Sequence, residues 1–299
     1  MCIESEIASG NDTFVSYSQN YEDVMLWRAL KHIKGGFYVD VGANDPVTAS
    51  VTKLFYDNGW NGINIEPCLS PYERLVEERP NDINLRLLAA SDESQLTFYE
   101  FDDSGWSTMD KRAAKLFSEQ GNEIRESLMA TNPLEKILDD CNAQTIHFLK
   151  IDVEGAEKSV IEGMSFSKHR PWILVIESTV PGTANHNHND WEGILLSNDY
   201  EFVYDDGLNR YYLAKEHLSL KHFFKYPPNV FDCYMPYSQV ALDEQCSEIS
   251  RSHEAVIAEL NECKLQLNEC KELYRKTLSR KIVRSLRHPK KIMSIILEK

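Results

Sequence analysis

Between residue 36 and about residue 213, short runs of apolar side chains alternate with longer segments of helical pattern. The pattern predicts strands at 37–41, 62–66, 85–89, 95–100, 146–152, 172–177, 202–204 and 211–214. It predicts helices at 49–58, 70–78, 134–140, 158–163 and 189–197. The strands that begin at Phe37, Ile146 and Trp172 are almost continuously apolar, which is typical of strands buried on both faces of a parallel sheet. We therefore expect an α/β fold, with helices on both faces of an open sheet and an antiparallel hairpin at the end.

A different pattern follows Pro236, where apolar residues recur at alternating spacings of four and three. The positions concerned are Ile249, His253, Val256, Leu260, Cys263, Leu267, Cys270 and Tyr274. The pentad Leu-Asn-Glu-Cys-Lys occurs at 260–264 and again seven residues later at 267–271. Such heptads are typical of a coiled coil, so residues 237–278 are expected to self-associate as a parallel dimer or trimer. The alternative is a long amphipathic helix docked on the chain's own body.

Charge and composition limit the kinds of molecule that the chain is expected to bind. The 299 residues are 42% hydrophobic and 26% charged, an ordinary globular composition. Residues 275–299 carry nine basic residues and one acidic residue, a net charge of +8, whereas residues 1–274 carry 23 basic and 46 acidic residues, a net charge of −23. The acidic body does not resemble a nucleic-acid binder, because affinity for phosphates needs clustered cations.

The basic C-terminal tail needs its own explanation. In residues 279–299, apolar side chains at helical spacing stand beside clustered cations, which is typical of a helix that lies on an anionic membrane surface. The alternative is a tail that folds back on the acidic body. Residues 1–11 lack the basic flank and apolar run of a secretory signal, and seven cysteines without a CxxC pair do not suggest a disulfide framework. We expect a cytoplasmic protein, peripheral at the inner face of the membrane.

Polar residues stand at the ends of the first three expected strands. Asp40 stands near the end of the first strand and can order the turn after it, where Gly42 lets the backbone pass close to a ligand and Asn44 follows. Glu66 ends the second strand, where a carboxylate can accept both hydroxyls of a ribose. Ser91 and Asp92 form a bend after the third strand that could cover an adenine. Taken singly, each is a weak signal, because loop glycines and strand-end acids are common. Their order is the layout of a class I S-adenosylmethionine methyltransferase, whereas the G-x-G-x-x-G of a dinucleotide fold is missing.

The sequence resembles the FkbM family of methyltransferases over about residues 16–236. The resemblance is carried by YSQNYEDVML, GFYVDVGANDP, FYDNGWNGINIEP, RPNDINLRLLAASD, FLKIDVEGAE, RPWILVIES, HNDWEGIL, FVYDDGLNRYYL and YPPNVFD. It implies a Rossmann-like fold for residues 1–236, with a mostly parallel seven-stranded sheet and a terminal antiparallel hairpin. It also implies methyl transfer from S-adenosylmethionine to an oxygen, commonly a sugar or polyketide hydroxyl. Pro46 departs from the family, because many members have glycine there.

The catalytic candidates come from the segment FLKIDVEGAE. Asp152 and Glu154 are two residues apart, and carboxylates that share a pocket raise one another's proton affinity, which suits a general base. Asp152 is also expected at the cofactor. Glu177 ends the next strand, so Asp152 and Glu177 are candidate ligands of Mg²⁺, as in metal-dependent sugar methyltransferases. The alternative is that Asp152 or Glu154 caps the helix that begins near Ala156.

The acceptor side is expected in three further segments. His188 matches a histidine of the family and is a second candidate base, although a solvated loop histidine is the common case. Asn209 and Arg210 resemble the acceptor loop of the family and suit sugar hydroxyls, or else form a hairpin turn with a surface ion pair. Trp106 could stack on a sugar or simply be half-buried. We expect an O-methyltransferase of a surface glycan or glycolipid; the alternatives are a secondary-metabolite O-methyltransferase and a non-catalytic scaffold on a coiled coil.

Overall fold

The computed structural model describes residues 13–101 and 104–287 of the chain. The chain divides into two compact units, residues 1–238 and 239–299. Within the described part, no helix combines the length and the apolarity needed to cross a membrane. The N-terminal segment that we expect to lack a secretory signal, and the basic tail from residue 288 onward, lie outside the described residues.

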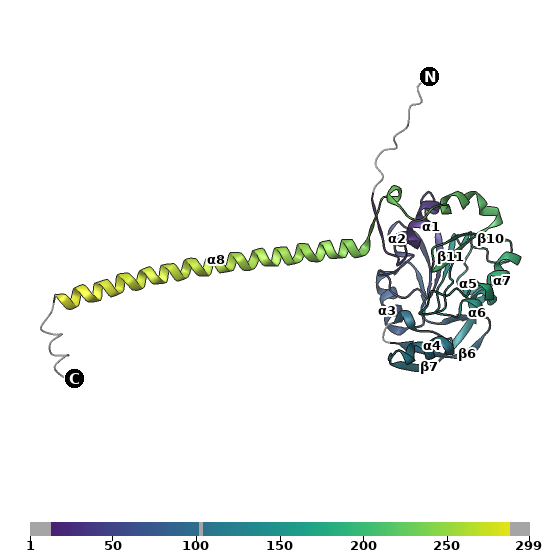
Figure 1. Ribbon diagram of the computed structural model, residues 1–299, viewed down its shortest axis with the longest axis horizontal. Helices are drawn as coiled ribbons and strands as arrows, with labels where there is room; N and C mark the ends of the chain where they lie inside the picture. Colours follow the sequence, from purple (N-terminus) through teal and green to yellow (C-terminus); the bar gives the residue numbers. More distant parts are fainter. Residues whose placement is uncertain (1–12, 102–103, 288–299) are drawn as a thin grey trace, which may run out of the picture. The chain divides into compact units, whose positions relative to one another are not determined.

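The first unit is built on a seven-stranded mixed sheet with the strand order β10-β11-β9-β8-β2-β3-β4 (Figure 1). Its strands are β2 (Phe37–Val41), β3 (Asn61–Ile65), β4 (Ile83–Leu85), β8 (Phe148–Ile151), β9 (Ile173–Glu177), β10 (Tyr200–Asp205) and β11 (Asn209–Ala214). The five strands from β9 to β4 are parallel, and the hairpin β10–β11 runs antiparallel at one edge. The expected α/β class is confirmed.

Alternate residues of the central strands enter two separate cores, one on each face of the sheet. Phe148, Val175 and Tyr211 belong to one core, and their neighbours in sequence belong to the other. Helix α1 contributes to the first core, whereas α5, α6 and α7 contribute to the second. Both faces of the sheet are therefore buried, which explains why these strands are almost continuously apolar in sequence. The helices are α1 (Glu22–Leu30), α2 (Lys53–Asp57), α3 (Leu69–Glu78), α4 (Lys111–Glu119), α5 (Leu134–Asp140), α6 (Glu157–Glu162) and α7 (Glu192–Ser197).

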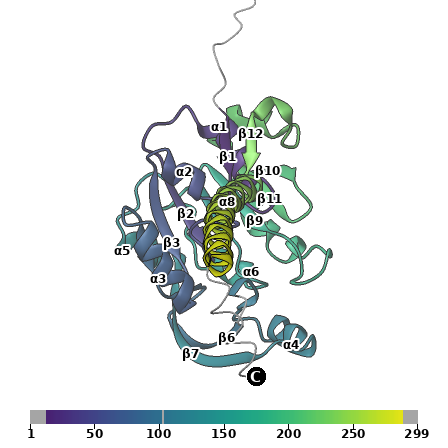
Figure 2. The same cartoon turned by 90° about the vertical axis from the view of Figure 1, so that its left-hand side faces the viewer.

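A second sheet of three strands corrects the strand expected at 85–89. This run is divided: Ile83–Leu85 is β4 at the edge of the large sheet, whereas β5 (Leu88–Ala90) pairs with β7 (Ile124–Pro133). Strand β7 also pairs antiparallel with β6 (Ser94–Phe101). Half of the side chains of β7 are exposed and one is buried, so no apolar pattern marks it in the sequence. In Figures 1 and 2, β6, β7 and α4 lie together at one end of this unit, away from α1.

Short elements complete the first unit. Strands β1 (Phe14–Ser16) and β12 (Tyr234–Pro236) pair in parallel, so the two ends of the unit lie side by side. Four 3₁₀ segments are η1 (Ser104–Trp106), η2 (His188–Asp190), η3 (Lys215–Phe224) and η4 (Val230–Asp232). Beyond them the chain continues as one long helix, α8 (Tyr237–Leu286). Whether α8 forms the expected coiled coil stays a prediction.

Candidate active site

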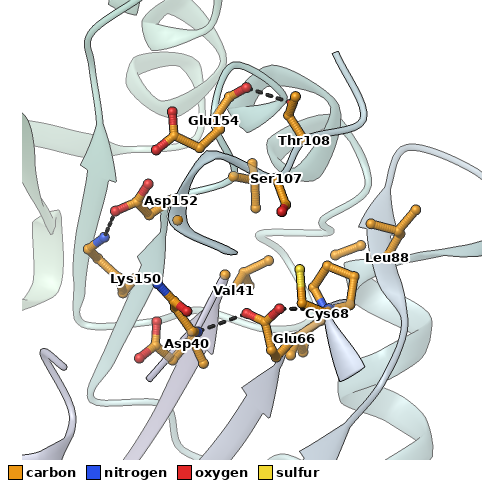
Figure 3. Close-up of a pocket in the computed structure, with 18 of the residues that line it drawn as sticks. Asp40, Val41, Glu66, Cys68, Leu88, Ser107, Thr108, Lys150, Asp152 and Glu154 are labelled. Atoms are coloured by element: carbon orange, nitrogen blue, oxygen red, sulfur yellow. Dashed lines mark hydrogen bonds and ion pairs between the residues drawn. The ribbon is translucent and has the colours of Figure 1, made fainter. Parts of the chain in front are cut away.

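A cavity opens at the carboxyl ends of β2, β3 and β8 (Figure 3). This is the edge at which ligands bind in open α/β sheets. The empty volume is about 960 Å³, part of which is open to solvent. One wall is apolar and contains Leu87, Leu88 and Phe98, whereas the opposite wall carries charged side chains from the strand tips.

The loop after β2 passes very close to β8. Gly42 has a φ of +83°, and a Cβ at this residue would lie 1.7 Å from the carbonyl oxygen of Asp152. Its N–H donates to the carbonyl of Ile65 at 3.0 Å. Gly42 lines the cavity as expected, but the backbone that comes close to it is that of Asp152. Pro46 stands where many family members have glycine, and its carbonyl accepts a hydrogen bond from the buried Arg79.

Glu66 follows β3 and is buried at the cavity wall. Its two carboxylate oxygens accept the backbone N–H groups of Asn44 at 2.8 Å and Cys68 at 2.7 Å (Figure 3). Burial raises the pKa of Glu66 to about 7, although these two hydrogen bonds oppose the shift. Glu66 and Asn44 both line the cavity, as the sequence predicts for residues of one site. The backbone N–H of Asn44 orients Glu66.

An ion pair lies at the centre of the charged wall. Lys150 Nζ is 2.6 Å from Asp152 Oδ2, and only 5% of the Lys150 side chain is exposed. Burial alone would lower the pKa of Lys150, but the carboxylates of Asp152, Glu22 and Asp40 outweigh burial and raise it. Burial would likewise raise the pKa of Asp152, yet Lys150 holds it below its usual range. Asp152 is therefore an ionised carboxylate at neutral pH.

Asp40 lies beside this pair and is almost fully buried. Burial raises its pKa to about 6, against the opposing effect of Lys150 and Arg79. The hydroxyl of Thr52 donates to Asp40 Oδ2 at 3.3 Å, so Asp40 joins β2 to the segment that precedes α2. Its expected role in ordering the loop fits this contact.

Three carboxylates converge beside the cavity. One oxygen from each of Asp152, Glu154 and Glu177 lies within 4.8 Å of the others. A spacing of two residues would place Asp152 and Glu154 on the same face of a strand. Strand β8 ends at Ile151, however, and the chain turns at Glu154, which has a φ of 52°, so the two residues do not share a strand face. Thr108 fixes this turn by donating to the carbonyl oxygen of Glu154 at 2.7 Å.

Glu177 is the buried member of this acidic trio. The hydroxyl of Thr179 donates to Glu177 Oε1 at 3.0 Å, whereas Oε2 has no hydrogen-bond partner among the described residues. Burial, followed by the charge of Asp152, raises the pKa of Glu177 to about 11. The trio thus holds a protonated Glu177 beside an ionised Asp152, rather than two carboxyls that both titrate near neutrality.

The capping alternative for Asp152 and Glu154 is wrong. Helix α6 has Ala156 at its N-cap, and no side chain caps it there. Its first residue, Glu157, instead reaches back and accepts the N–H groups of Val153 at 3.2 Å and Gly155 at 3.0 Å. Glu157 therefore stabilises the turn, and Asp152 and Glu154 line the cavity.

Ser91 and Asp92 do not line the cavity, which corrects their assignment to the adenine. The N–H of Ser91 donates to Ser159 Oγ at 3.1 Å, and Asp92 Oδ1 accepts from Ser94 Oγ at 3.1 Å. The cause is the break between β4 and β5, because β5 carries the chain into the second sheet before residue 91 is reached. The apolar wall at Leu88 stands where the bend was expected.

None of the expected acceptor residues lines the cavity, although both neighbours of Trp106 in the chain do. Trp106 stacks on Phe117 with ring centroids 5.2 Å apart, so it is half-buried in a small core. Asn209 is fully buried and donates to Glu22 Oε1 at 2.9 Å. Both side chains are held inside the fold; Asn209 binds Glu22, whose carboxylate acts on Lys150, instead of lining the cavity.

Arg210 and His188 form part of a separate polar cluster. Arg210 pairs with Glu192 and Asp205, each at 2.9 Å, and packs 3.9 Å from the Phe202 ring. Burial and the nearby charge of Arg210 lower the pKa of His188. His188 is therefore neutral at pH 7, but it does not line the cavity with Asp152.

Sequence reasoning missed the residue at the centre of the site, Lys150. Its signal was a single cation inside the otherwise apolar run Phe148–Ile151, a position where lysine is rarely buried without a partner. It also missed Glu22, which lies within the family-like segment YSQNYEDVML but received no role, and Thr108. Only the fold brings them beside Lys150 and Glu154.

The chain is similar to proteins of one family. The model of the Methyltransferase FkbM domain matches residues 40–202, a span that includes Asp40, Glu66 and Asp152. A similar solved structure is the crystal structure of Methyltransferase FkbM from Methylobacillus flagellatus KT, at 20% sequence identity and a TM-score of 0.39. The match covers 60% of this chain and 43% of that one, so this chain spans less than half of its length. No curated protein matches the chain. Because the domain model covers more than half of the 299 residues, the chain belongs to the FkbM methyltransferase family.

Proposed function

We propose that the chain is an S-adenosylmethionine-dependent O-methyltransferase and that its acceptor is a hydroxyl of a sugar in a surface glycan or glycolipid. Family membership supports methyl transfer in general, and the cavity at the strand tips supports a nucleoside-sized cofactor. A hydroxyl of a secondary metabolite would need the same chemistry and is the alternative acceptor. A non-catalytic scaffold is the alternative from another class.

The charge of the cavity carries this proposal. Among the described residues, four carboxyl side chains line it and Lys150 is the one basic side chain. The carboxyls are those of Asp40, Glu66, Asp152 and Glu154. A pyrophosphate would be repelled by this lining, whereas S-adenosylmethionine carries a sulfonium and an ammonium group that the lining attracts. The residues therefore fit S-adenosylmethionine better than a dinucleotide.

Each wall of the cavity has a role in this proposal. The carboxylate of Glu66 would accept the ribose hydroxyls, because each of its oxygens has a second lone pair beyond the one that Asn44 or Cys68 uses. Leu88 and Phe98 would pack against the adenine. When bound, the cofactor supplies an activated methyl group.

The proton of the acceptor hydroxyl would go to Asp152. Methyl transfer requires an aligned hydroxyl and a group that takes its proton. Asp152 is ionised because Lys150 holds its pKa down, and Glu177 keeps its own proton. Neighbouring carboxyls whose pKa values are pushed apart are typical of acid–base pairs in enzymes. Glu154 and Thr108 would fix the turn that shapes this side of the cavity.

The first test removes the carboxylate at the ribose. Glu66→Ala should weaken binding of S-adenosylmethionine at least tenfold, because a hydrogen bond to a charged group contributes about 1.5–3 kcal/mol. Isothermal calorimetry on the full chain measures it. Glu162→Ala is the matched control, since Glu162 is a partly exposed side chain of α6. An affinity for Glu66→Ala within threefold of wild type would remove Glu66 from the site.

We also propose that the acidic trio binds a divalent cation such as Mg²⁺. Oxygen ligands from Asp152, Glu154 and Glu177 suit such an ion, and the unpartnered Oε2 of the buried Glu177 is the observation that favours it. The cation would supply positive charge next to the reacting hydroxyl. Glu177 would then be ionised, since a bound cation lowers the pKa of its ligands.

Addition of Mg²⁺ to the EDTA-treated chain should raise its melting temperature, because a ligand that binds only the folded state stabilises it. Glu177→Gln should abolish the increase, and Glu135→Gln, a surface glutamate of α5, should preserve it. The melting temperature can be followed by differential scanning fluorimetry. If Mg²⁺ does not change the melting temperature of the wild-type chain, or if methyl transfer survives EDTA, the trio binds no metal. Glu177 then stays protonated beside the ionised Asp152.

A further inference from the structure

Helix α8 displays a row of exposed apolar side chains. Every side chain from residue 242 to residue 284 is exposed. Large apolar residues on this stretch include Ile249, Leu260 and Leu267, which are 62%, 52% and 54% exposed. A continuous exposed apolar row of this kind marks an interaction surface.

The row follows a heptad register without interruption from Leu242 to Tyr274. The a positions are Cys246, His253, Leu260, Leu267 and Tyr274, and the d positions are Leu242, Ile249, Val256, Cys263 and Cys270. These ten positions extend the eight sequence-based positions at their N-terminal end, by Leu242 and Cys246. A strict seven-residue repeat keeps its seam facing another supercoiled helix, whereas a helix docked on a globular surface has a broader apolar face of period 3.6. The period therefore indicates another copy of α8 as the partner.

The cysteines of α8 support the same seam. Cys246, Cys263 and Cys270 are the three cysteines of the helix, and all of them are exposed thiols. Three residues placed at random would all fall on the two seam positions of a heptad in roughly one case in forty. The thiols are small apolar side chains that a coiled-coil seam can bury.

The charges beside the seam indicate the orientation. Glu259 occupies a g position and Lys264 the e position five residues later. In a parallel, in-register pair, residue g of one helix lies beside residue e of the next heptad in the other, so these opposite charges meet twice. In an antiparallel pair, g faces g and e faces e, and this contact is lost.

We propose that α8 joins a second copy of this chain in a parallel, in-register coiled coil whose seam runs from Leu242 to Tyr274. This interaction is independent of the proposed methyl transfer. It places each seam cysteine of one copy beside the same cysteine of the other. Because the seam lies on α8, its disruption leaves the core of residues 13–238 unchanged.

The first experiment measures the mass of the full chain by light scattering coupled to size exclusion. The wild-type chain should run as an oligomer, and the double variant Leu260→Asp, Leu267→Asp should run as a monomer with unchanged tryptophan fluorescence. Leu265→Asp is the matched control, because Leu265 is at position f on the outer side of the helix and is 66% exposed. It should remain oligomeric. A monomeric wild type, or an oligomeric double variant, would overturn the proposal.

The second experiment tests the orientation with thiols. One variant retains Cys246 and another retains Cys270 as its only seam cysteine, the others being serine. Diamide oxidises two thiols to one disulfide and takes up both hydrogens, so both variants should give a covalent dimer on a non-reducing gel. An antiparallel pair can bring only one of the two residues opposite itself, because they are 24 residues apart. A variant with all three seam cysteines replaced gives the background, and cross-linking of only one single-cysteine variant would refute the parallel register.

Discussion

Replacement of Asp152 by asparagine should lower the turnover number by roughly 10²–10⁴, the usual range for loss of a general base. The amide cannot take the proton of the acceptor hydroxyl, but it preserves the shape of the side chain. Affinity for S-adenosylmethionine should stay within about threefold of wild type, since Glu66 and the apolar wall remain. Labelled cofactor and a glycan extract of the host provide the assay for turnover, and calorimetry provides the affinity.

The matched control for this variant is Asp140→Asn, at an exposed carboxylate of α5 that pairs with Lys136 at 2.9 Å. It should retain full turnover. Full activity of Asp152→Asn would move the base elsewhere, with Glu154 the next carboxylate of the cavity to test. A parallel loss of cofactor affinity would show that Asp152 acts in binding rather than in proton transfer.

The second large effect is expected for Lys150→Met, which should destabilise the α/β unit by about 3–5 kcal/mol at pH 7. The change keeps the length of the side chain but removes the one cation that faces Asp152, Glu22 and Asp40. The loss should be smaller at pH 5, because without Lys150 these carboxyls have raised pKa values and protonation relieves their repulsion. Urea unfolding followed by tryptophan fluorescence reports this unit alone, since all five tryptophans lie within residues 1–238.

Lys168→Met is the control for Lys150→Met. Lys168 also pairs with carboxylates, those of Asp139 and Glu135, but half of its side chain is exposed. Surface ion pairs contribute about 0–1 kcal/mol, so this variant should remain close to wild type. Equal effects of the two substitutions would show that the buried charge balance around Lys150 is unimportant for stability.

The large sheet could be predicted because burial on both faces leaves a plain pattern in the sequence. Strands β2, β8 and β9 each contain a single charged residue among apolar ones, and each was expected within two residues of its observed ends. The second sheet could not be predicted in the same way. Its long strand β7 exposes half of its side chains and buries one, so its sequence shows no alternation of apolar and polar residues. Without β7 as the partner of β5, the break between β4 and β5 cannot be predicted.

The candidate site was predictable where a residue stands at the tip of a central parallel strand. Asp40, Gly42, Glu66, Asp152 and Glu154 meet in one cavity because parallel strands end at the same edge of the sheet. Ser91 and Asp92 were misplaced because the strand before them belongs to the second sheet. Arg210 was expected to bind the substrate, but it pairs with the carboxylates of Glu192 and Asp205. The spacing of these residues in the sequence does not predict either ion pair.

The most direct measurement is a calorimetric titration of the full chain with S-adenosylmethionine, with NAD⁺ and ATP titrated in parallel. We expect saturable binding of one S-adenosylmethionine per chain and no binding of the two anionic nucleotides, because four carboxyls and one ammonium group line the cavity. Absence of saturable heat at millimolar S-adenosylmethionine, or tighter binding of NAD⁺ or ATP, would contradict the assignment of this cavity as a methyl-donor site.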